Sequence, residues 1–598
     1  MSKYFCNPLN VSYRYQFVRD PMNNRITAAR EAADPSLIYF KGKYYIFASM
    51  TLEVWESTDL VTWIPHRLPD NLPLYDYAPD VTAAGEYVYF CASKSSEICN
   101  YYRTKDVING PYEEIKGSFE FWDPNLFLDD DGRLYFYWGC GSMTPIWGTE
   151  LDPETLHPLG QKAELISGDA FKKGYERIGK NHSLLPLSDG EIEEKYQEFL
   201  REKGVKKEQI PPEAETAIKG LFAQKPFIEG AWMNKYQGKY YLQYACPGTE
   251  YNVYGDGVYV SENPLGPFRP ARNNPYSYKP GGFCPGAGHG STIWDQNKNL
   301  WHTATMSISV NHKFERRIGL WPAGFDEEGE MFCNQRYGDW PYEVSGCHTD
   351  PWKDPAWFLM SYKKPVSTSS FVKGNEAEKV TDENIQTWWM AAERDGQWLE
   401  MDLEKVSDVR AIQVNFAEDI QNIPVPESKL GLKTDRYIEE NILPLRWKLK
   451  GSRDGNEYFM IEDKSCSMDC LPHDLIVREN GVSVRYLRLE FIEMPYRQRP
   501  CISGLRVFGI GTGDKPDKPT FTAKRISDLD MEVVIEGKAA AGYNILWGHD
   551  KDKLYHSYMT FDNIQKAGAL VKGQEYFIRV DAFNENGITK GDVVPLEK

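Results

Sequence analysis

The chain has 598 residues, a formal net charge of −18 and an aromatic content of 14%. Its length suggests about three or four domains, and its acidic balance argues against binding to nucleic acid or to anionic membranes, which need basic patches. The sequence has no stretch of about 18 apolar residues, which argues against a membrane-spanning helix. The many aromatic residues are typical of β-rich proteins and are common where sugar rings are stacked.

The chain opens with Met1 to Pro8, without the basic head and apolar stretch of a signal peptide. Its eleven cysteines are odd in number and scattered, which fits a reducing compartment. Cys466 and Cys470 lie close together, but no second pair completes a zinc-ligand set. We therefore expect a cytoplasmic protein, or one whose leader has been removed.

One pattern recurs five times before residue 305: an acid or a His, a short apolar run, a turn and an aromatic-rich strand. A hairpin unit repeated in this way is typical of a β-propeller. The residues that head the five copies are Asp34, Asp80, Asp123, Glu229 and His289. Because equivalent positions of propeller blades converge on the central axis, we expect these side chains to meet in one pocket.

The interval between the third and fourth head residues is too long for one blade, which needs about 40 to 50 residues, so it carries an insertion over about residues 168–224. Within the insertion, Ile192, Tyr196 and Leu200 recur at helical spacing, and Gly204 ends the pattern. This predicts a helix on a loop between blades. The insertion either borders the pocket or is a solvated decoration.

Three segments follow the repeats of residues 1–345. Residues 346–365 form a linker rich in Pro and Trp, and residues 366–511 show short alternating strands, a β-sandwich pattern that resembles the discoidin-like fold. Residues 519–598 close on the strand Tyr576–Asn584 and resemble a fibronectin type III sandwich. We therefore expect an all-β chain, with a five-bladed β-propeller followed by two C-terminal β-sandwich domains.

Acids at corresponding points of different blades suit the cleavage of glycosidic bonds. One carboxylic acid must protonate the leaving oxygen, and one carboxylate must act from the other side. The three strongest motifs are Ala33-Asp34-Pro35-Ser36, Trp122-Asp123-Pro124-Asn125 and Ile228-Glu229-Gly230-Ala231-Trp232. On these motifs, in this order within a five-fold repeat, the N-terminal region resembles glycoside hydrolase family 43, whose fold is a five-bladed propeller.

The resemblance implies a role for each of these acids. Asp34 would be the general base that activates water, Asp123 would tune the pKa of the acid and orient it, and Glu229 would be the general acid. The implied reaction is an inverting hydrolysis, with base and acid roughly 6.5 to 9.5 Å apart so that a water fits between substrate and base. This chemistry requires no cofactor.

Four more residues are candidates for substrate binding. Asp80 is either a sugar ligand or a residue that closes the blade, and Trp232 is either part of a sugar-stacking floor or core. By the resemblance, His289 lies near the axis, where it is also a candidate ligand for a calcium ion, although calcium prefers oxygen ligands. Arg317 resembles the family's late pocket arginine, with Arg316 as its rival.

The resemblance implies an exo-glycosidase that removes β-xylosyl or α-L-arabinofuranosyl residues from plant-type oligosaccharides. Tyr77, which stands where the family commonly has Trp, leaves the sugar open. Two alternatives therefore remain: a galactosidase or galactofuranosidase of the same fold, in one variant retaining, and a carbohydrate-binding propeller without catalysis. An oligosaccharide is the expected partner in each case, and the sequence gives no indication of the oligomeric state.

Overall fold

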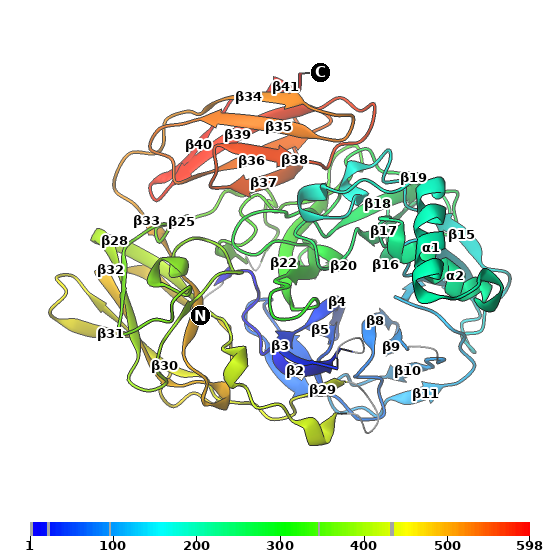
Figure 1. Ribbon diagram of the computed structural model, residues 1–598, viewed down its shortest axis with the longest axis horizontal. Coiled ribbons are helices and arrows are strands. Elements are labelled where there is room, and N and C mark those ends of the chain that lie inside the picture. Colours follow the sequence, from blue (N-terminus) through cyan, green and yellow to red (C-terminus); the bar gives the residue numbers. More distant parts are fainter. Residues whose placement is uncertain (1–3, 21–23, 95–96, 345–346, 431–435, 598) are drawn as a thin grey trace.

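The computed structural model describes residues 4–20, 24–94, 97–344, 347–430 and 436–597. Within these ranges the regular secondary structure consists mainly of β-strands, and the α-helices are α1 (Asp189–Lys203) and α2 (Pro212–Phe222) (Figure 1). In this part of the chain, no helix is both long and apolar enough to cross a membrane. The expectation of an all-β chain is confirmed.

Five antiparallel sheets of four strands each follow one another between residues 33 and 333. They are β4 (Ala33–Phe40), β5 (Lys43–Ser49), β6 (Glu53–Ser57) and β7 (Ile64–Arg67); β8 (Tyr77–Ala84), β9 (Tyr87–Ser93), β10 (Tyr101–Thr104) and β11 (Glu113–Ile115); β12 (Asn125–Leu128), β13 (Leu134–Trp138), β14 (Ile146–Leu151) and β15 (Ala163–Ile166); β16 (Glu229–Tyr236), β17 (Lys239–Cys246), β18 (Gly255–Ser261) and β19 (Arg269–Pro270); and β20 (Gly288–Trp294), β21 (Leu300–Ser307), β22 (Arg316–Phe325) and β23 (Met331–Cys333). The first strands form a closed ring, because β4 contacts β8 and β20, β12 contacts β8 and β16, and β16 contacts β20. Sheets arranged around such a ring form a β-propeller.

Each of the five sheets has a residue in the left-handed backbone region close to the start of its first strand. These residues are Asp34 (φ 50°), Ala78 (φ 47°), Asp123 (φ 49°), Gly230 (φ 61°) and His289 (φ 53°). In the sheets that begin with β4, β8, β16 and β20, the pairing with the second strand shifts register at this residue. The equivalence expected from the sequence is therefore wrong at two heads, since Asp80 lies two residues beyond its sheet's left-handed residue and Glu229 lies one residue before it.

The residue two positions after each left-handed residue bonds to the next sheet. We call these residues the latch ring: Ser36, Asp80, Asn125, Trp232 and Ser291. Its hydrogen bonds run from Ser36 Oγ to the Pro79 carbonyl (2.7 Å), from the Leu126 N–H to Asp80 (2.7 Å), from the Met233 N–H to Asn125 Oδ1 (2.9 Å), from Trp232 Nε1 to the Thr292 carbonyl (3.1 Å) and from Ser291 Oγ to the Pro35 carbonyl (2.8 Å). Each bond contributes about 0.5–1.5 kcal/mol, so together they hold neighbouring first strands in register.

The insertion contains both helices. The Ser188 side chain accepts a hydrogen bond from the Glu191 N–H, and the Glu191 carboxylate accepts one from the Ser188 N–H, so a capping box starts α1. Gly204, at φ 64°, ends the helix. These observations confirm the predicted helix, whereas α2 was not predicted. Gly220 of α2 lies against Ser142, so the insertion packs beside the loop that follows β13.

The second region is built around one eight-stranded sheet. Its strands are β25 (Phe358–Leu359), β26 (Val366–Thr368), β27 (Trp389–Met390), β28 (Trp398–Phe416), β30 (Arg446–Ser452), β31 (Tyr458–Asp463), β32 (His473–Glu493) and β33 (Cys501–Ile510). Trp389 and Trp447 lie in the apolar core of this region.

The same region also reaches back to the start of the chain. Its strand β29 (Arg436–Ile438) completes a three-stranded sheet with β2 (Arg14–Arg19) and β3 (Ile26–Glu31). A short ladder between β1 (Tyr4–Phe5) and β24 (Tyr342–Glu343) ties the first residues of the chain to the end of the repeats.

The last region has two sheets, which lie above the propeller in Figure 1. They comprise β34 (Thr520–Arg525), β35 (Met531–Glu536) and β38 (Ile564–Ala567), and β36 (Gly542–Gly548), β37 (His556–Thr560), β39 (Phe577–Asn584), β40 (Gly587–Lys590) and β41 (Val594–Pro595). One apolar cluster joins Tyr137 and Leu242 of the propeller to Val533 and Ile545 of this region. The two parts therefore share a hydrophobic core.

Candidate active site

Three of the left-handed residues bring their side chains together at the centre of the ring. His289 Nδ1 lies 3.4 Å from Asp34 Oδ1 and 3.9 Å from Asp123 Oδ2. Their backbone N–H groups are all satisfied by side chains, since Asp34 donates to Thr305 Oγ1 (2.8 Å), Asp123 to Ser93 Oγ (2.7 Å) and His289 to Asp256 Oδ1 (2.7 Å). These hydrogen bonds hold the left-handed backbone of Asp34, Asp123 and His289 and so position their side chains.

Asp34 is held as a carboxylate. Its side chain is only 5% exposed, and burial by itself would raise its pKa, but Arg316, at 3.3 Å, and His289 outweigh burial and lower the pKa of Asp34 below its ordinary value. The Ser49 hydroxyl also donates to Asp34 Oδ2 at 2.8 Å. A buried, ionised carboxylate of this kind can accept a proton from water.

The pKa of Asp123 is shifted in the opposite direction from that of Asp34. Burial raises its pKa to about 7, the carboxylates of Glu229 and Asp34 raise it too, and His289 opposes them. Asp34 differs because the Arg316 guanidinium lowers its pKa, whereas no arginine acts in this way on Asp123 among the described residues. Two acids at one centre thus have pKa values that are shifted in opposite directions.

Glu229 lies beside Asp123 and is held by two donors. The Tyr254 phenol donates to Oε1 at 2.7 Å, and the Cys140 thiol donates to Oε2 at 3.3 Å. Burial, together with the nearby acids, raises the pKa of Cys140, so this thiol stays protonated. Sequence reasoning missed both donors, because each comes from outside the repeated motif.

Gly230 allows the close approach of Glu229 and His289. A Cβ atom at this position would lie 2.7 Å from the His289 ring. Burial disfavours the charged imidazolium, but the carboxylates of Asp34, Asp123 and Glu229 outweigh burial and raise the pKa of His289. The imidazole is therefore the cation shared by the three acids.

The side chains at this centre do not fit the calcium ion considered for His289. The donor group found here among the described residues is Asp123, Cys140 and Glu229, and it includes a thiol, whereas calcium takes oxygen ligands. His289 supplies a nitrogen, and its Nδ1 atom faces carboxylates that it already pairs with. We assign no ion to the site.

Two predicted binding residues belong to the latch ring. Asp80 accepts hydrogen bonds from the Leu126 N–H and from Asn125 Nδ2, and burial raises its pKa to about 7. This geometry fits the blade-closing alternative for Asp80. Trp232 Nε1 donates to the Thr292 carbonyl, so the indole spans two sheets.

The structure does not bring Arg317 to the centre. Its Nε atom donates to His473 Nε2 at 2.9 Å, so its side chain faces the second region. Neighbouring residues of a strand point to opposite faces, which sends Arg316 toward Asp34 and Arg317 away from it. The prediction for Arg317 is therefore wrong, and its rival Arg316 takes that place.

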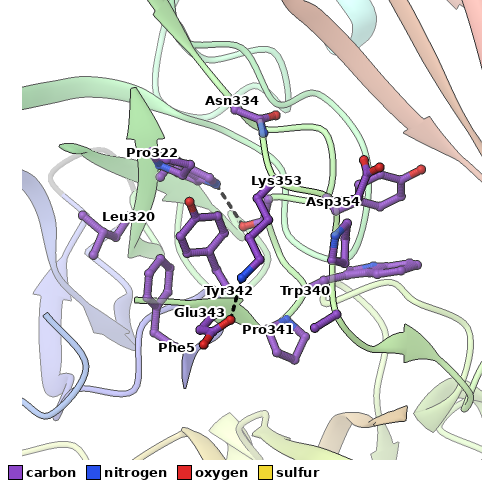
Figure 2. Close-up of a pocket in the computed structure, with 15 residues that line it drawn as sticks. Phe5, Leu320, Pro322, Asn334, Trp340, Pro341, Tyr342, Glu343, Lys353 and Asp354 are labelled. Atoms are coloured by element: carbon purple, nitrogen blue, oxygen red, sulfur yellow. Dashed lines mark hydrogen bonds and ion pairs between the residues drawn. The ribbon is translucent and has the colours of Figure 1, made fainter. Parts of the chain in front are cut away.

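A small cavity lies elsewhere, where the propeller meets the linker. It has a volume of about 40 Å³, and Figure 2 shows Phe5, Leu320 and Tyr342 in its wall. The ion pair between Lys353 and Glu343 (2.6 Å) crosses it. None of the central carboxylates lines this cavity, so it is separate from the candidate active site.

Comparison with known proteins agrees with the site. A family model described as "Glycosyl hydrolases family 43" matches residues 24–179 and 195–331, and the unmatched stretch between them falls in the insertion. The "Xylosidase/arabinosidase 43A" of Humicola insolens is 30% identical over 271 residues, which cover 40% of this chain and 77% of that protein. A "Xylosidase/arabinosidase" of Bacteroides ovatus is 25% identical over 272 residues, covering 40% and 75%.

Among solved structures, "Bacteroides ovatus Xyloglucan PUL GH43B" is similar over 99% of this chain and 98% of that one, with 15% identity and a TM-score of 0.41. The family match covers the residues that meet at the centre of the ring. The chain is a glycoside hydrolase and belongs to glycosyl hydrolases family 43.

Proposed function

We propose that this glycoside hydrolase is an inverting exo-enzyme that removes terminal β-xylosyl or α-L-arabinofuranosyl residues from short oligosaccharides. The observation that carries the proposal is the pairing of one carboxylate held ionised, Asp34, with a second carboxyl group held by neutral donors, Glu229. An inverting glycosidase needs such a pair, one group to activate water and one to protonate the leaving oxygen.

In this mechanism Asp34 takes a proton from the attacking water. Its ion pair with Arg316 keeps it ionised at the pH of the reaction. Glu229 gives a proton to the leaving oxygen, while the Tyr254 and Cys140 hydrogen bonds hold its carboxyl group in place. Asp123 stands next to Glu229, and the Glu229 carboxylate, after burial, helps to raise the pKa of Asp123.

The finer architecture is part of the proposal. We assign the five four-stranded sheets to the five blades of one propeller, on the closed ring of first strands. The eight-stranded sheet of residues 358–510 is assigned to a discoidin-like domain, and the two sheets of residues 520–595 to a fibronectin type III-like domain. The strand order and the motifs support these assignments.

The choice of sugar rests on the names of relatives, four of which are called xylosidase or xylosidase/arabinosidase. A second candidate follows from the "Beta-D-galactofuranosidase xynD" of Aspergillus niger, which is 24% identical over 271 residues. Galactofuranosides present a five-membered ring, as arabinofuranosides do. Both furanosides therefore belong in a substrate test.

Four aryl glycosides test the proposal: the β-xyloside, the α-L-arabinofuranoside, the β-galactoside and the β-galactofuranoside. The wild-type enzyme should hydrolyse the first or the second fastest. Glu229→Ala should lower turnover by roughly 10²–10⁴-fold while oligosaccharide binding persists. Binding without turnover in the wild type would instead identify a carbohydrate-binding propeller.

A further inference from the structure

Arg436 of strand β29 links the second region to the surroundings of the active site. Strand β29 pairs with β2, with Val18 opposite Arg436 and Gln16 opposite Ile438. A residue far along the chain is thus built into a sheet of the N-terminal region. Apolar packing of Phe17 with Tyr437 reinforces the join.

Arg436 points from this sheet toward the ring. Its guanidinium donates to Gln16 Oε1 at 2.7 Å, donates to the Tyr77 phenol and lies 3.6 Å from Glu31 Oε2. It also stands 5.1 Å from the centre of the Tyr77 ring, in the geometry of a cation–π contact. Tyr77 opens strand β8, so this contact connects Arg436 to the first strand of the second sheet.

Glu31 is shared between two arginines. Arg316 Nε donates to Glu31 Oε1 at 2.9 Å, on the opposite carboxylate oxygen from Arg436. Arg316 in turn lies 3.3 Å from Asp34. The four groups form a row of alternating charge, Arg436, Glu31, Arg316 and Asp34, whose last three members are at most 5% exposed. Solvent screens such a row weakly, so a change at one end is felt at the other.

We propose that Arg436 is a positioning residue for the catalytic base: by satisfying one oxygen of Glu31, it leaves Arg316 free to pair with Asp34. The inference rests on the proposed function, in which Asp34 is the base. It gives the second region a part in catalysis, since the propeller alone lacks this cation.

The groups around the row do not replace Arg436. His289, Asp123 and the phenol of Tyr254 act on Asp34 from the ring centre. On the Glu31 side stands His312, whose pKa is lowered by burial in spite of Glu31, and Arg436 and Arg316 lower it further. Without Arg436, the Glu31 carboxylate would keep Arg316 as its charged partner and would draw Arg316 away from Asp34.

The test uses the full chain with Arg436→Gln, and Lys429→Gln as a matched control. Lys429 belongs to the same segment and donates to the Tyr437 phenol at 2.6 Å, so its loss removes an equal charge without touching Glu31. Arg436→Gln should lower kcat by roughly tenfold at pH 5, with KM changed less than about twofold. In the pH profile of kcat/KM, the acidic limb, where activity falls as the base is protonated, should move to higher pH by roughly half a unit. The reason is that Asp34 loses part of its interaction with the Arg316 cation.

Two further variants keep the result interpretable. Arg436→Lys should restore the position of the acidic limb in part, because it returns the charge. In Glu31→Gln, the limb should move down, because Arg316 is released to Asp34, and adding Arg436→Gln to that variant should change kcat less than about twofold.

The inference is overturned if Arg436→Gln folds, as judged by its melting transition, and keeps the wild-type limb, or if its effect is equally large with and without Glu31. Failure of the proposed function is a separate outcome: the wild type would then cleave none of the aryl glycosides, or Asp34→Asn would retain full turnover.

Discussion

The guanidinium of Arg316 lies 3.3 Å from the carboxylate of Asp34, and both groups are buried. Arg316→Met should lower kcat/KM by roughly 100-fold near pH 5, because the loss of the cation raises the pKa of Asp34 and leaves more of the base protonated. Part of the activity should return as the pH rises. A pH series of kcat/KM measures this, and an equal loss at every pH would contradict it.

Arg317→Met is the matched control for that experiment. Arg317 donates to His473 and to the backbone carbonyl groups of Arg30 and Arg316, and not to the central acids. The variant should lose stability by about 1–3 kcal/mol, because buried partners lose a charged donor, and its folded fraction should keep its kcat. Urea unfolding measures the stability, and kcat divided by the folded fraction at the assay temperature measures the catalytic effect.

Gly230→Ala should reduce kcat by roughly 10- to 100-fold, because the added Cβ atom would lie 2.7 Å from the His289 ring and push it from the acids. Backbone strain is not the main cause, since Asp34 and Asp123 adopt similar positive φ angles with side chains. Gly238→Ala is the control: Gly238 has φ 78° with nothing within 4 Å of the added atom, so it should cost stability alone. Equal kcat values for the two variants would refute the argument.

The free energy of unfolding of Asp80→Asn should rise relative to that of the wild type between about pH 4.5 and pH 7.5. This interval runs roughly from the pKa of an aspartate in the unfolded chain to the pKa of Asp80 in the folded protein. Burial raises the pKa of Asp80 to about 7 in the folded state, so folding retains a proton that the unfolded chain releases. The wild type therefore loses stability over this interval, by up to roughly 3 kcal/mol, and the amide does not. Urea unfolding at both pH values measures the difference, and a difference independent of pH would show that Asp80 is ionised in the fold.

The first sugar released should have the opposite anomeric configuration to the substrate. Water activated by Asp34 attacks from the face opposite the leaving group, and no covalent intermediate forms. Proton NMR during the first minutes of hydrolysis, before mutarotation, detects the nascent anomer. Retention of configuration would make Asp34 a nucleophile and would exclude the role given to it here.

The repeated pattern of the sequence predicted the ring and the residues at its centre, but not the register within each repeat. Acidic heads suggested that Asp80 and Glu229 correspond to Asp34, whereas the left-handed positions are Ala78 and Gly230. A positive φ at a residue with a side chain leaves no mark in the sequence. Its hydrogen-bonding consequences, such as the Ser49 contact to the Ala78 N–H, appear only in the fold.

The supporting groups were harder to predict than the acids. Cys140 and Tyr254 come from segments outside the repeated motif, and only the fold brings them to Glu229. Arg436 belongs to another region, and nothing near it in the sequence points to Glu31. The choice between Arg316 and Arg317 depends on the phase of β22 relative to the ring, which strand alternation alone does not set.

The closure of the ring has a consequence for how the enzyme is made. Ser291 donates a hydrogen bond to the carbonyl of Pro35, which lies 256 residues earlier in the chain. Arg316 pairs with Asp34, which is synthesised 282 residues before Arg316. During translation the base is therefore exposed to solvent without its cation until the fifth sheet has emerged. A nascent chain released after Glu229 but before that point carries all three acids and no assembled catalytic centre.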